Sequence, residues 1–344
     1  MGNLVEFSAV NSKMMAIKGK MIKKDVYDEL LNAKDYNKVV EILRDKTHYK
    51  NLLEREDISV LRRINLEMLL NKNFVSLLEK LSHYFSGDYK KVISILFLRY
   101  EVEDLKLIIR GKFIEKDKED IKKALLFRSK LNTIDYDYLI EAKNLDDLSE
   151  RLKGSIYYKT IKRNIDKVDK SLFMLETELD FLYFSSIRKI VKKLNKENRK
   201  ALEIIIGFQA DLANLSWIYR GKFYYEITPE ELYNFTIYDR YKLKKDLIKN
   251  LCYAKGIDEF RDLIRKFPYK SIYDTTDVAN IQLNEKECLK KFVSKIFSKN
   301  ESNLSTLLSF IILYRLEINE IITIAEEKRY SLDFDESKEY VAMN

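Results

Sequence analysis

The chain repeats itself with a period of about 110 residues, and this repetition restricts the folds that it can adopt. The sequence Arg-Gly-Lys-Phe occurs at 110–113 and again at 220–223. Residues 27–49 align with residues 136–158 without a gap and share an Ala-Lys pair. The segment that begins at Leu66 aligns with the segment that begins at Leu175, and the Arg-Gly-Lys-Phe copies follow in the same order. Such a chain is expected to fold as successive copies of one structural unit.

A third copy follows in weaker form. Residues 251–269 repeat the segment with the Ala-Lys pair, and residues 316–330 repeat the segment that leads into Arg-Gly-Lys-Phe. Glu326 and Glu327 stand where the other copies have Arg and Gly. The aligned acidic residues are Glu101, Asp211 and Glu317, and the aligned lysines are Lys112, Lys222 and Lys328.

Each repeat is predicted to be a bundle of several helices. Only Pro229 and Pro268 could interrupt helices as prolines do, and no segment shows a strong strand-like alternation. Thr228, Pro229 and Glu231 form a capping box that opens the third copy. The sequence therefore predicts an all-α protein of three similar helical bundles, at 1–118, 119–227 and 228–344.

The two segments that end in Arg-Gly-Lys-Phe each predict an amphipathic helix. Apolar residues recur there at spacings of three, four and four, as one buried helix face requires. The predicted buried residues are Val102, Leu105, Ile109 and Phe113 in the first copy, and Leu212, Leu215, Tyr219 and Phe223 in the second.

The Arg-Gly-Lys triplets themselves allow three interpretations. Glycine could permit a close helix contact or a left-handed helix end, while the cations complement the carbonyl end of the helix. Alternatively, equivalent helix ends could place basic groups around one rim that meets an acidic partner. A phosphate-binding loop is the weakest interpretation, because neither copy follows a strand or lies in a glycine-rich loop.

Membrane insertion and export are not expected. The longest charge-free apolar runs, such as residues 307–314, are far shorter than the ~20 residues of a membrane span. The first ten residues lack the charged and apolar regions of a signal peptide. Cys252 and Cys288 have no metal-ligand spacing, so a disulfide framework or a zinc site is also not expected, and a reducing compartment is favoured.

The net charge of +8 raises the alternative of a helical scaffold that binds nucleic acid or another anionic partner through basic faces. The basic run at 187–200 is the best candidate for such a face. Its apolar residues fall at helical spacing, however, with the lysines on the other side, which is typical of an ordinary solvated helix. The alternative, functional interpretation is that this basic run attracts an anionic partner or lipid headgroups.

An intrinsic active site is not predicted. His48 and His83 are the only histidines, and neither cysteine has a histidine at a recognisable family spacing. His48 falls at a repeat position that Tyr157 fills in the second copy, so it is expected to pack or to lie at the surface. No catalytic, cofactor or metal residue and no small-molecule substrate are therefore expected.

Three segments follow one another along the chain: a helix with an Ala-Lys pair, the segment ETELDFLYF and the helix DLANLSWIYRGKF. This order resembles the C subunit of V-type and archaeal-type ATPases or ATP synthases. Its eukaryotic counterpart is the d subunit of the membrane sector. The resemblance covers nearly the whole chain and includes the threefold repeat, and residues 316–341 are the most family-like segment. Its motifs are structural rather than catalytic.

This resemblance implies a non-catalytic rotor subunit. Three helical units would form a funnel with pseudo-threefold symmetry, seated on the cytoplasmic face of the proteolipid ring and holding the foot of the central axle. The protein would be monomeric when isolated, would reach the membrane only through its partners, and would support transport of protons or sodium coupled to ATP. The candidate interface residues are Arg110, Lys112, Arg220, Lys222, Glu101, Asp211 and Glu317.

Overall fold

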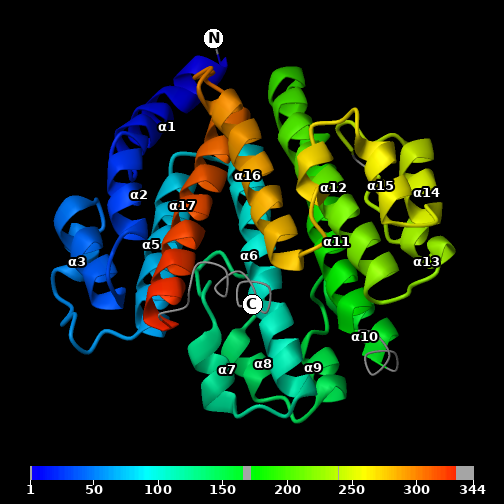
Figure 1. Cartoon of the computed structure of the whole chain (residues 1–344), viewed down its shortest axis with the longest axis horizontal. Helices are drawn as coiled ribbons and strands as arrows, with labels where there is room; N and C mark the ends of the chain where they lie inside the picture. The colour runs from blue at the N-terminus through cyan, green and yellow to red at the C-terminus, as the bar shows by residue number, and fades with distance from the viewer. Residues whose placement is uncertain (1, 166–171, 239, 331–344) are drawn as a thin grey trace. The chain divides into compact units, whose positions relative to one another are not determined.

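The regular secondary structure of the described residues is helical (Figure 1). The computed structural model describes residues 2–165, 172–238 and 240–330, and no strand occurs in these ranges. The prediction of an all-α fold is therefore confirmed. The segment SLDFDESKEYV, which contributed to the family resemblance, lies outside the described residues.

Helices follow one another in the same order in each third of the chain. The first third contains α1 (Gly2–Lys18), α2 (Lys24–Leu31), α3 (Tyr36–Lys46), α4 (Lys50–Leu53), α5 (Arg63–Ser82) and α6 (Gly87–Phe113). The second contains α7 (Lys118–Ala124), α8 (Tyr136–Ile140), α9 (Leu145–Arg151), α10 (Tyr158–Asn164), α11 (Leu172–Val191) and α12 (Lys196–Phe223). The last contains α13 (Pro229–Asn234), α14 (Lys245–Tyr253), α15 (Ile257–Ile264), the 3-10 helix η2 (Lys270–Tyr273), α16 (Val278–Phe297) and α17 (Leu304–Tyr330).

Helix lengths reproduce the sequence repeat. In each third, several short helices are followed by one helix of 20 residues and then by one of 27 or 28 residues. The long pairs are α5–α6, α11–α12 and α16–α17. The predicted boundaries at 118 and 227 fall at the first residue of α7 and between α12 and α13. The division into three domains at those boundaries stays a prediction.

Contacts group the chain into two compact units. Unit 1 contains residues 1–74 and 254–344, and unit 2 contains residues 75–253. In unit 2, α6 packs against α11 and contacts the short helices α7, α8 and α9. The other long helix of this unit, α12, contacts α11, α13 and α14. Each long helix thus contacts the short helices that follow it in the chain.

In unit 1, the contact between a long helix and short helices joins the two ends of the sequence. No further short helices follow α17 among the described residues, and α17 instead contacts α3 as well as α1 and α16. The last long helix therefore takes the place beside the first short helices that α6 and α12 take beside theirs.

Helix ends follow local sequence signals. At the start of α13, the Thr228 side chain accepts the Glu231 N–H, and the Glu231 carboxylate accepts the Thr228 N–H, so the predicted capping box is confirmed. At the end of α6, the Lys116 N–H donates to the Gly111 carbonyl over 2.8 Å, and Glu115 has a φ of 53°. Glu226, after α12, has a φ of 50°. Both helices therefore end on a left-handed residue, which is a Glu rather than the glycine of the motif.

The predicted buried faces are largely correct. Val102, Leu105 and Ile109 of α6 are buried, as are Leu212, Leu215 and Tyr219 of α12. Phe113 was predicted to share this face, but 40% of its surface is exposed. Phe113 is the last residue of α6. The apolar spacing of the sequence therefore extends to a helix end that the core no longer covers.

Candidate functional site

Arg110 and Arg220 both lie near the beginning of α11 in unit 2. The Arg110 guanidinium donates to both carboxylate oxygens of Glu176, with Nε–Oε1 at 2.5 Å and Nη2–Oε2 at 2.7 Å. Arg220 lies over the ring of Phe173, with its guanidinium carbon 5.3 Å from the ring centre. Because Phe173 and Glu176 are within one turn of α11, this helix brings the two repeated arginines onto one surface.

Aromatic rings contact Arg220, and exposed apolar residues follow each arginine within four to five positions of the chain. The ring of Tyr225 stacks on that of Phe173, with their centres 4.5 Å apart, and its hydroxyl lies 3.5 Å from Arg220. Phe113, Ile114, Tyr224 and Tyr225 are between 40% and 66% exposed, although they are large and apolar in character. We call this surface the arginine–aromatic rim, and its members are Arg110, Phe113, Ile114, Arg220, Tyr224 and Tyr225.

The composition of the rim is that of a protein-binding surface. Arginine and tyrosine are enriched in the central parts of protein interfaces, where they contribute much of the binding energy. The side chain of Arg110 is 53% exposed, so its ion pair with Glu176 leaves part of the guanidinium open to solvent. Sequence reasoning singled out the two arginines but missed the exposed aromatics beside them. A signal was present, since Tyr224 and Tyr225 directly follow the second motif copy.

Both lysines of the motif form hydrogen bonds with backbone carbonyl groups of the chain itself. The Lys112 ammonium donates to the Ile140 carbonyl at the end of α8, and Lys222 donates to the Cys252 carbonyl near the end of α14 over 2.9 Å. Both carbonyls lie two residues before an alanine of the repeated Ala-Lys pair. Burial lowers the pKa of Lys112. Each lysine thus ties its long helix to a short helix of the next repeat, and a partner contact by either stays a prediction.

The glycines of the motif allow close helix contacts. A Cβ atom on Gly111 would lie 2.6 Å from Cγ1 of Ile121 in α7, and one on Gly221 would overlap Cδ2 of Leu232 in α13. Neither glycine has a positive φ. Of the two structural roles considered for this glycine, the structure therefore shows close approach rather than the helix end.

The first of the three aligned acids, Glu101, is fully buried and hydrogen-bonded within unit 2. It accepts the Thr133 N–H, the Thr133 hydroxyl over 2.6 Å and the Tyr157 hydroxyl over 2.7 Å. The carboxylate on α6 thereby anchors the connection before α8 and the residue before α10.

Glu317, the third aligned acid, makes the corresponding contacts in unit 1. It accepts the Ile22 N–H over 2.8 Å and the Tyr49 hydroxyl over 3.0 Å. Tyr49 therefore corresponds to Tyr157 rather than to Tyr158, so the ungapped alignment of these segments is wrong by one residue at its end.

His48 contributes to the surroundings of Glu317 and has no equivalent ring beside Glu101. Its Nε2 lies 3.5 Å from the Glu317 carboxylate, and its Nδ1 lies 2.9 Å from the Lys20 carbonyl. Burial raises the pKa of Glu317 to about 7 and lowers the pKa of His48. His48 thus packs in a polar cluster of the interior, as expected of a structural residue.

Asp211, the second aligned acid, is also fully buried. Its carboxylate accepts the backbone N–H groups of Tyr241, Lys242 and Leu243, at 3.2, 2.6 and 3.2 Å. One turn later, Asn214 binds the N–H and the carbonyl of Ile237. All three aligned acids therefore have structural partners inside the chain, and contact with an external partner stays a prediction for them.

In the third repeat, a glutamate takes the position of the motif arginine and forms an ion pair with an arginine of another helix. Glu326 stands at the position of Arg110 and accepts from Arg63 of α5 over 3.0 Å. In the first repeat, the cation of the ion pair belongs to the longer helix, α6, whereas here the longer helix, α17, carries the carboxylate. Arg220 of the second repeat contacts the rings of Phe173 and Tyr225. The third motif copy has thus kept a charged contact while losing the arginine.

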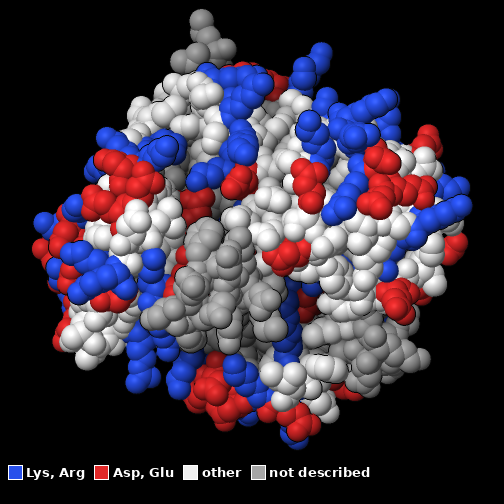
Figure 2. Space-filling view, viewed as in Figure 1, with Lys and Arg blue, Asp and Glu red and all other residues white. Residues whose placement is uncertain are grey.

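Other kinds of site find little support within the described residues. No group of three His, Cys, Asp or Glu side chains there could hold a metal ion, and none of the described helices combines the length and apolar character that crossing a membrane requires. On the face shown in Figure 2, Lys and Arg alternate with Asp and Glu instead of forming one continuous basic stripe. That pattern does not favour a nucleic-acid groove on this face.

Comparison with known proteins identifies the family of the chain. The family model described as ATP synthase (C/AC39) subunit matches residues 10–340. The chain is 23% identical to the C subunit of the A-type ATP synthase of Methanosphaera stadtmanae, over 93% of this chain and 83% of that protein. It is 21% identical to the C subunit of the A-type ATP synthase of Archaeoglobus fulgidus, over 97% and 96% of the two chains. The chain therefore belongs to the ATP synthase (C/AC39) subunit family.

Proposed function

We propose that this protein is the rotor subunit that joins the central axle of a rotary ATPase or ATP synthase to the proteolipid ring of its membrane sector. Membership in the ATP synthase (C/AC39) subunit family makes the chain a non-catalytic subunit of such a complex. The single observation that supports a docking role is the arginine–aromatic rim, which exposes interface-forming side chains at the ends of two equivalent helices.

The internal contacts suit a protein that transmits torque. A coupling element has to resist deformation, because any soft joint would absorb the rotation that it should pass on. Here Glu101 and Asp211 in unit 2, and Glu317 in unit 1, each connect a long helix to segments that flank short helices of another repeat through hydrogen bonds to a buried carboxylate. Buried and satisfied polar contacts of this kind favour one arrangement of the helices over others.

We further propose that the protein works at the cytoplasmic face of the membrane, reaches the bilayer only through its partner subunits, and is monomeric when isolated. The rim would receive an acidic and aromatic surface of the axle or ring, since opposite charge aligns the partners while aromatic contacts hold them. Its role is expected to be the same whether the complex transports protons or sodium ions.

Co-purification tests this function directly. A tagged chain isolated from solubilised membranes is expected to bring down the axle subunits and the proteolipid ring in fixed ratio. Recovery of the chain alone, or with nucleic acid that nuclease treatment removes, would contradict the proposal and favour the anionic-scaffold alternative.

The rim is tested by Arg110→Ala combined with Arg220→Ala. We expect the helical circular dichroism to be unchanged and the free energy of unfolding to fall by less than about 1 kcal/mol, because both arginines are at exposed helix ends. Attachment to the partner subunits should weaken, and added salt should weaken the wild type in the same way.

A matched control is Arg55→Ala combined with Arg265→Ala, which removes the same charge from exposed positions in unit 1. The control should assemble as the wild type does. Unchanged affinity of the rim variant at both low and high ionic strength would leave Arg110 and Arg220 as structural residues only.

A further inference from the structure

A carboxylate and an imidazole face each other in the interior of unit 1, where the two ends of the chain meet. Glu317 of α17 is 2% exposed, and the side chain of His48, which follows α3, is 12% exposed. The Glu317 Oε1 lies 3.5 Å from the His48 Nε2. Two groups that can each bind a proton are therefore in contact, largely shielded from bulk water.

The hydrogen bonds around His48 determine which ring nitrogen carries a hydrogen. Its Nδ1 lies 2.9 Å from the Lys20 carbonyl oxygen, which can only accept a hydrogen bond. In the neutral ring, Nδ1 therefore carries the hydrogen, and Nε2 presents a lone pair to the Glu317 carboxylate. The Tyr314 hydroxyl, 3.4 Å from Nε2, can donate to it. No hydrogen then lies between Nε2 and Oε1 unless one of these two atoms is protonated.

The equivalent carboxylate of unit 2 has different surroundings. Glu101 accepts the Thr133 N–H, the Thr133 hydroxyl and the Tyr157 hydroxyl. All three partners are donors, and donors stabilise a carboxylate in its charged form. The residue before Tyr157 is Ile156, which takes the position of His48 and offers no lone pair. The surroundings of Glu101 therefore suit an anion.

Among the described residues, Glu317 has fewer hydrogen-bond donors than Glu101. It accepts the Ile22 N–H and the Tyr49 hydroxyl, whereas the Nε2 of neutral His48 brings a lone pair instead of a hydrogen. Burial raises the pKa of Glu317 to about 7 and lowers the pKa of His48. Both shifts favour a neutral pair, in which the protonated carboxyl group donates to Nε2.

Other charged groups near the pair modify this preference. Lys18 of α1 favours the Glu317 anion, and Glu320 of α17 disfavours it. Glu320 is itself paired with Lys290 of α16 over 2.5 Å. Burial outweighs each of these effects on Glu317, so the neutral pair stays preferred. The remaining ionisable groups near the pair are Lys20, Tyr27, Tyr49, Lys286 and Tyr314.

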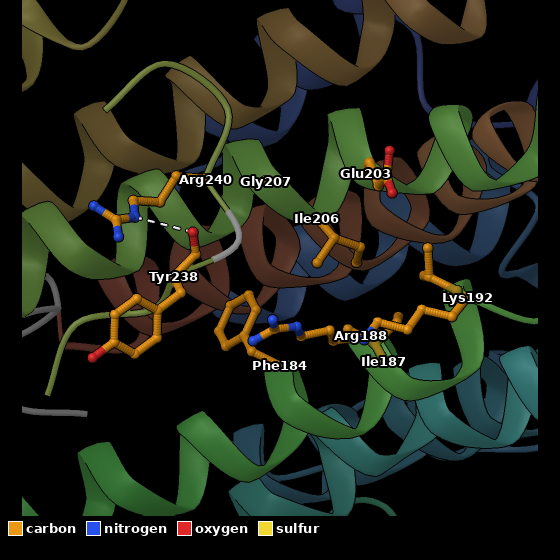
Figure 3. A pocket seen from close by; sticks show the side chains of 10 residues that line it. Phe184, Ile187, Arg188, Lys192, Glu203, Ile206, Gly207, Tyr238 and Arg240 are labelled. Carbon is orange, nitrogen blue, oxygen red and sulfur yellow. Dashed lines mark hydrogen bonds between the residues drawn. The ribbon is translucent and has the colours of Figure 1, made fainter. Parts of the chain in front are cut away.

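A change of charge at this pair differs from one at the surface because little water screens it. In unit 2, Arg188, Lys192 and Glu203 line a pocket of about 390 Å³ but are exposed, so solvent screens their charges (Figure 3). At Glu317, an unscreened negative charge would act on the hydrogen bonds that connect α17 with the first repeat.

We propose that Glu317 and His48 together form a binding site for one proton, and that this proton holds residues 20–49 against α17. While the proton is bound, the pair is neutral, and the carboxyl group of Glu317 binds Ile22, His48 and Tyr49 together. Release of the proton to solvent leaves an anion against the Nε2 lone pair, which weakens the contact between the two ends of the chain. This proton site is independent of the rim and of the assembly of the complex.

Carbon-13 NMR of the glutamate carboxyl carbons in the isolated full-length chain measures the proton binding. The Glu317 signal is identified by its absence in Glu317→Gln, and in the wild type it should titrate with a pKa of about 7. In His48→Gln, the new amide can donate to the carboxylate, so the proton affinity of Glu317 should fall about tenfold or more. The control is His83→Gln, at an exposed position, which should change that affinity less than about twofold.

Hydrogen exchange of the Ile22 N–H measures the contact between the chain ends. Its protection in the wild type, divided by its protection in Glu317→Gln at the same pH, should fall about tenfold between pH 6 and pH 8. The direction follows from the raised pKa of Glu317, because its contribution is complete below pH 4.5 and is lost as pH rises through 7. The Thr133 N–H, which donates to Glu101, is the internal control, and its ratio should stay constant.

Two results would contradict the shared site, namely titration of Glu317 near its ordinary pKa of 4.5 or an unchanged proton affinity in His48→Gln. Two others would contradict the link between proton and contact, namely a constant protection ratio at Ile22 or equal falls at Ile22 and Thr133. Any one of these results would overturn the proposal.

Discussion

At the scale of single residues, the Arg, Gly and Lys of the repeated motif have different structural roles. Lys112 and Lys222 donate to carbonyl groups at the ends of short helices, and Gly111 and Gly221 make room for a neighbouring helix. The exposed Arg110 pairs with Glu176, and the half-buried Arg220 lies over the ring of Phe173. Lys222 reaches the Cys252 carbonyl, 30 positions away in the sequence, because the fold brings α14 against α12 and the lysine stem spans the remaining distance. Sequence spacing alone gives no sign of that distant partner, so the sequence left a structural role and a basic interface both open for these lysines.

Replacing Gly111 by Ala should destabilise the protein despite the better helix propensity of alanine. The new Cβ would overlap Ile121, and overpacking of this kind costs about 1–3 kcal/mol against a gain of at most about 1 kcal/mol from propensity. Urea unfolding measures the difference. In the double variant Gly111→Ala/Ile121→Ala, the two effects should be less than additive. Full additivity would show that α7 does not approach α6 at this glycine.

Glu317 should make stability depend on pH. Its folded pKa of about 7 exceeds the ordinary value of 4.5, so its contribution is complete below pH 4.5 and is lost as pH rises through 7. The loss can reach about 3 kcal/mol, from 1.4 kcal/mol per pKa unit. In Glu317→Gln, the unfolding free energy should fall less between pH 5 and pH 7.5 than in the wild type. Equal pH dependence in both proteins would contradict the raised pKa.

At the scale of elements, the feature that repeats is the contact between each long helix and the short helices of another repeat. Helix α6 is anchored to the connection before α8, α12 to Ile237 and to residues 241–243, and α17 to the segment before α2. The sequence predicts helices, the capping box of α13 and the repeat period, because these depend on local chemistry and spacing. It does not predict which helices touch, because hydrogen bonds between Glu317 and residues 295 and 268 positions away leave no periodic signal.

Removing an anchor should loosen one element before it unfolds the protein. In Asp211→Ala, the N–H groups of residues 241–243 lose their acceptor, so hydrogen exchange there should become much faster. A buried donor left without a partner costs about 1–3 kcal/mol, and the global stability should fall by at least that amount. Asp246→Ala, at an exposed position of α14, is the control and should change neither quantity substantially. Unaltered exchange at 241–243 in Asp211→Ala would refute the anchoring role.

At the scale of the whole molecule, the two ends of the chain are structurally dependent on each other. Because α17 contacts α3 and Glu317 binds Ile22 and Tyr49, a chain truncated after residue 303 should lose protection in α2 and α3, hundreds of residues away in sequence. Limited proteolysis is expected to cut between residues 20 and 50, while α7–α9 stay protected by α6. Selective cleavage in α7–α9 would contradict this dependence.

The reversed ion pair between Glu326 and Arg63 has a consequence for recognition. A body made of three indistinguishable repeats would offer any partner three docking orientations of equal energy, and a motor assembled from such parts would have no defined angular register. Changing the sign of the charge at one of the three positions removes that degeneracy, because a partner surface that complements arginine is repelled by glutamate. If the three repeats are arranged about a common axis, as the proposed function requires, the divergence of the third motif copy would distinguish one docking orientation from the other two.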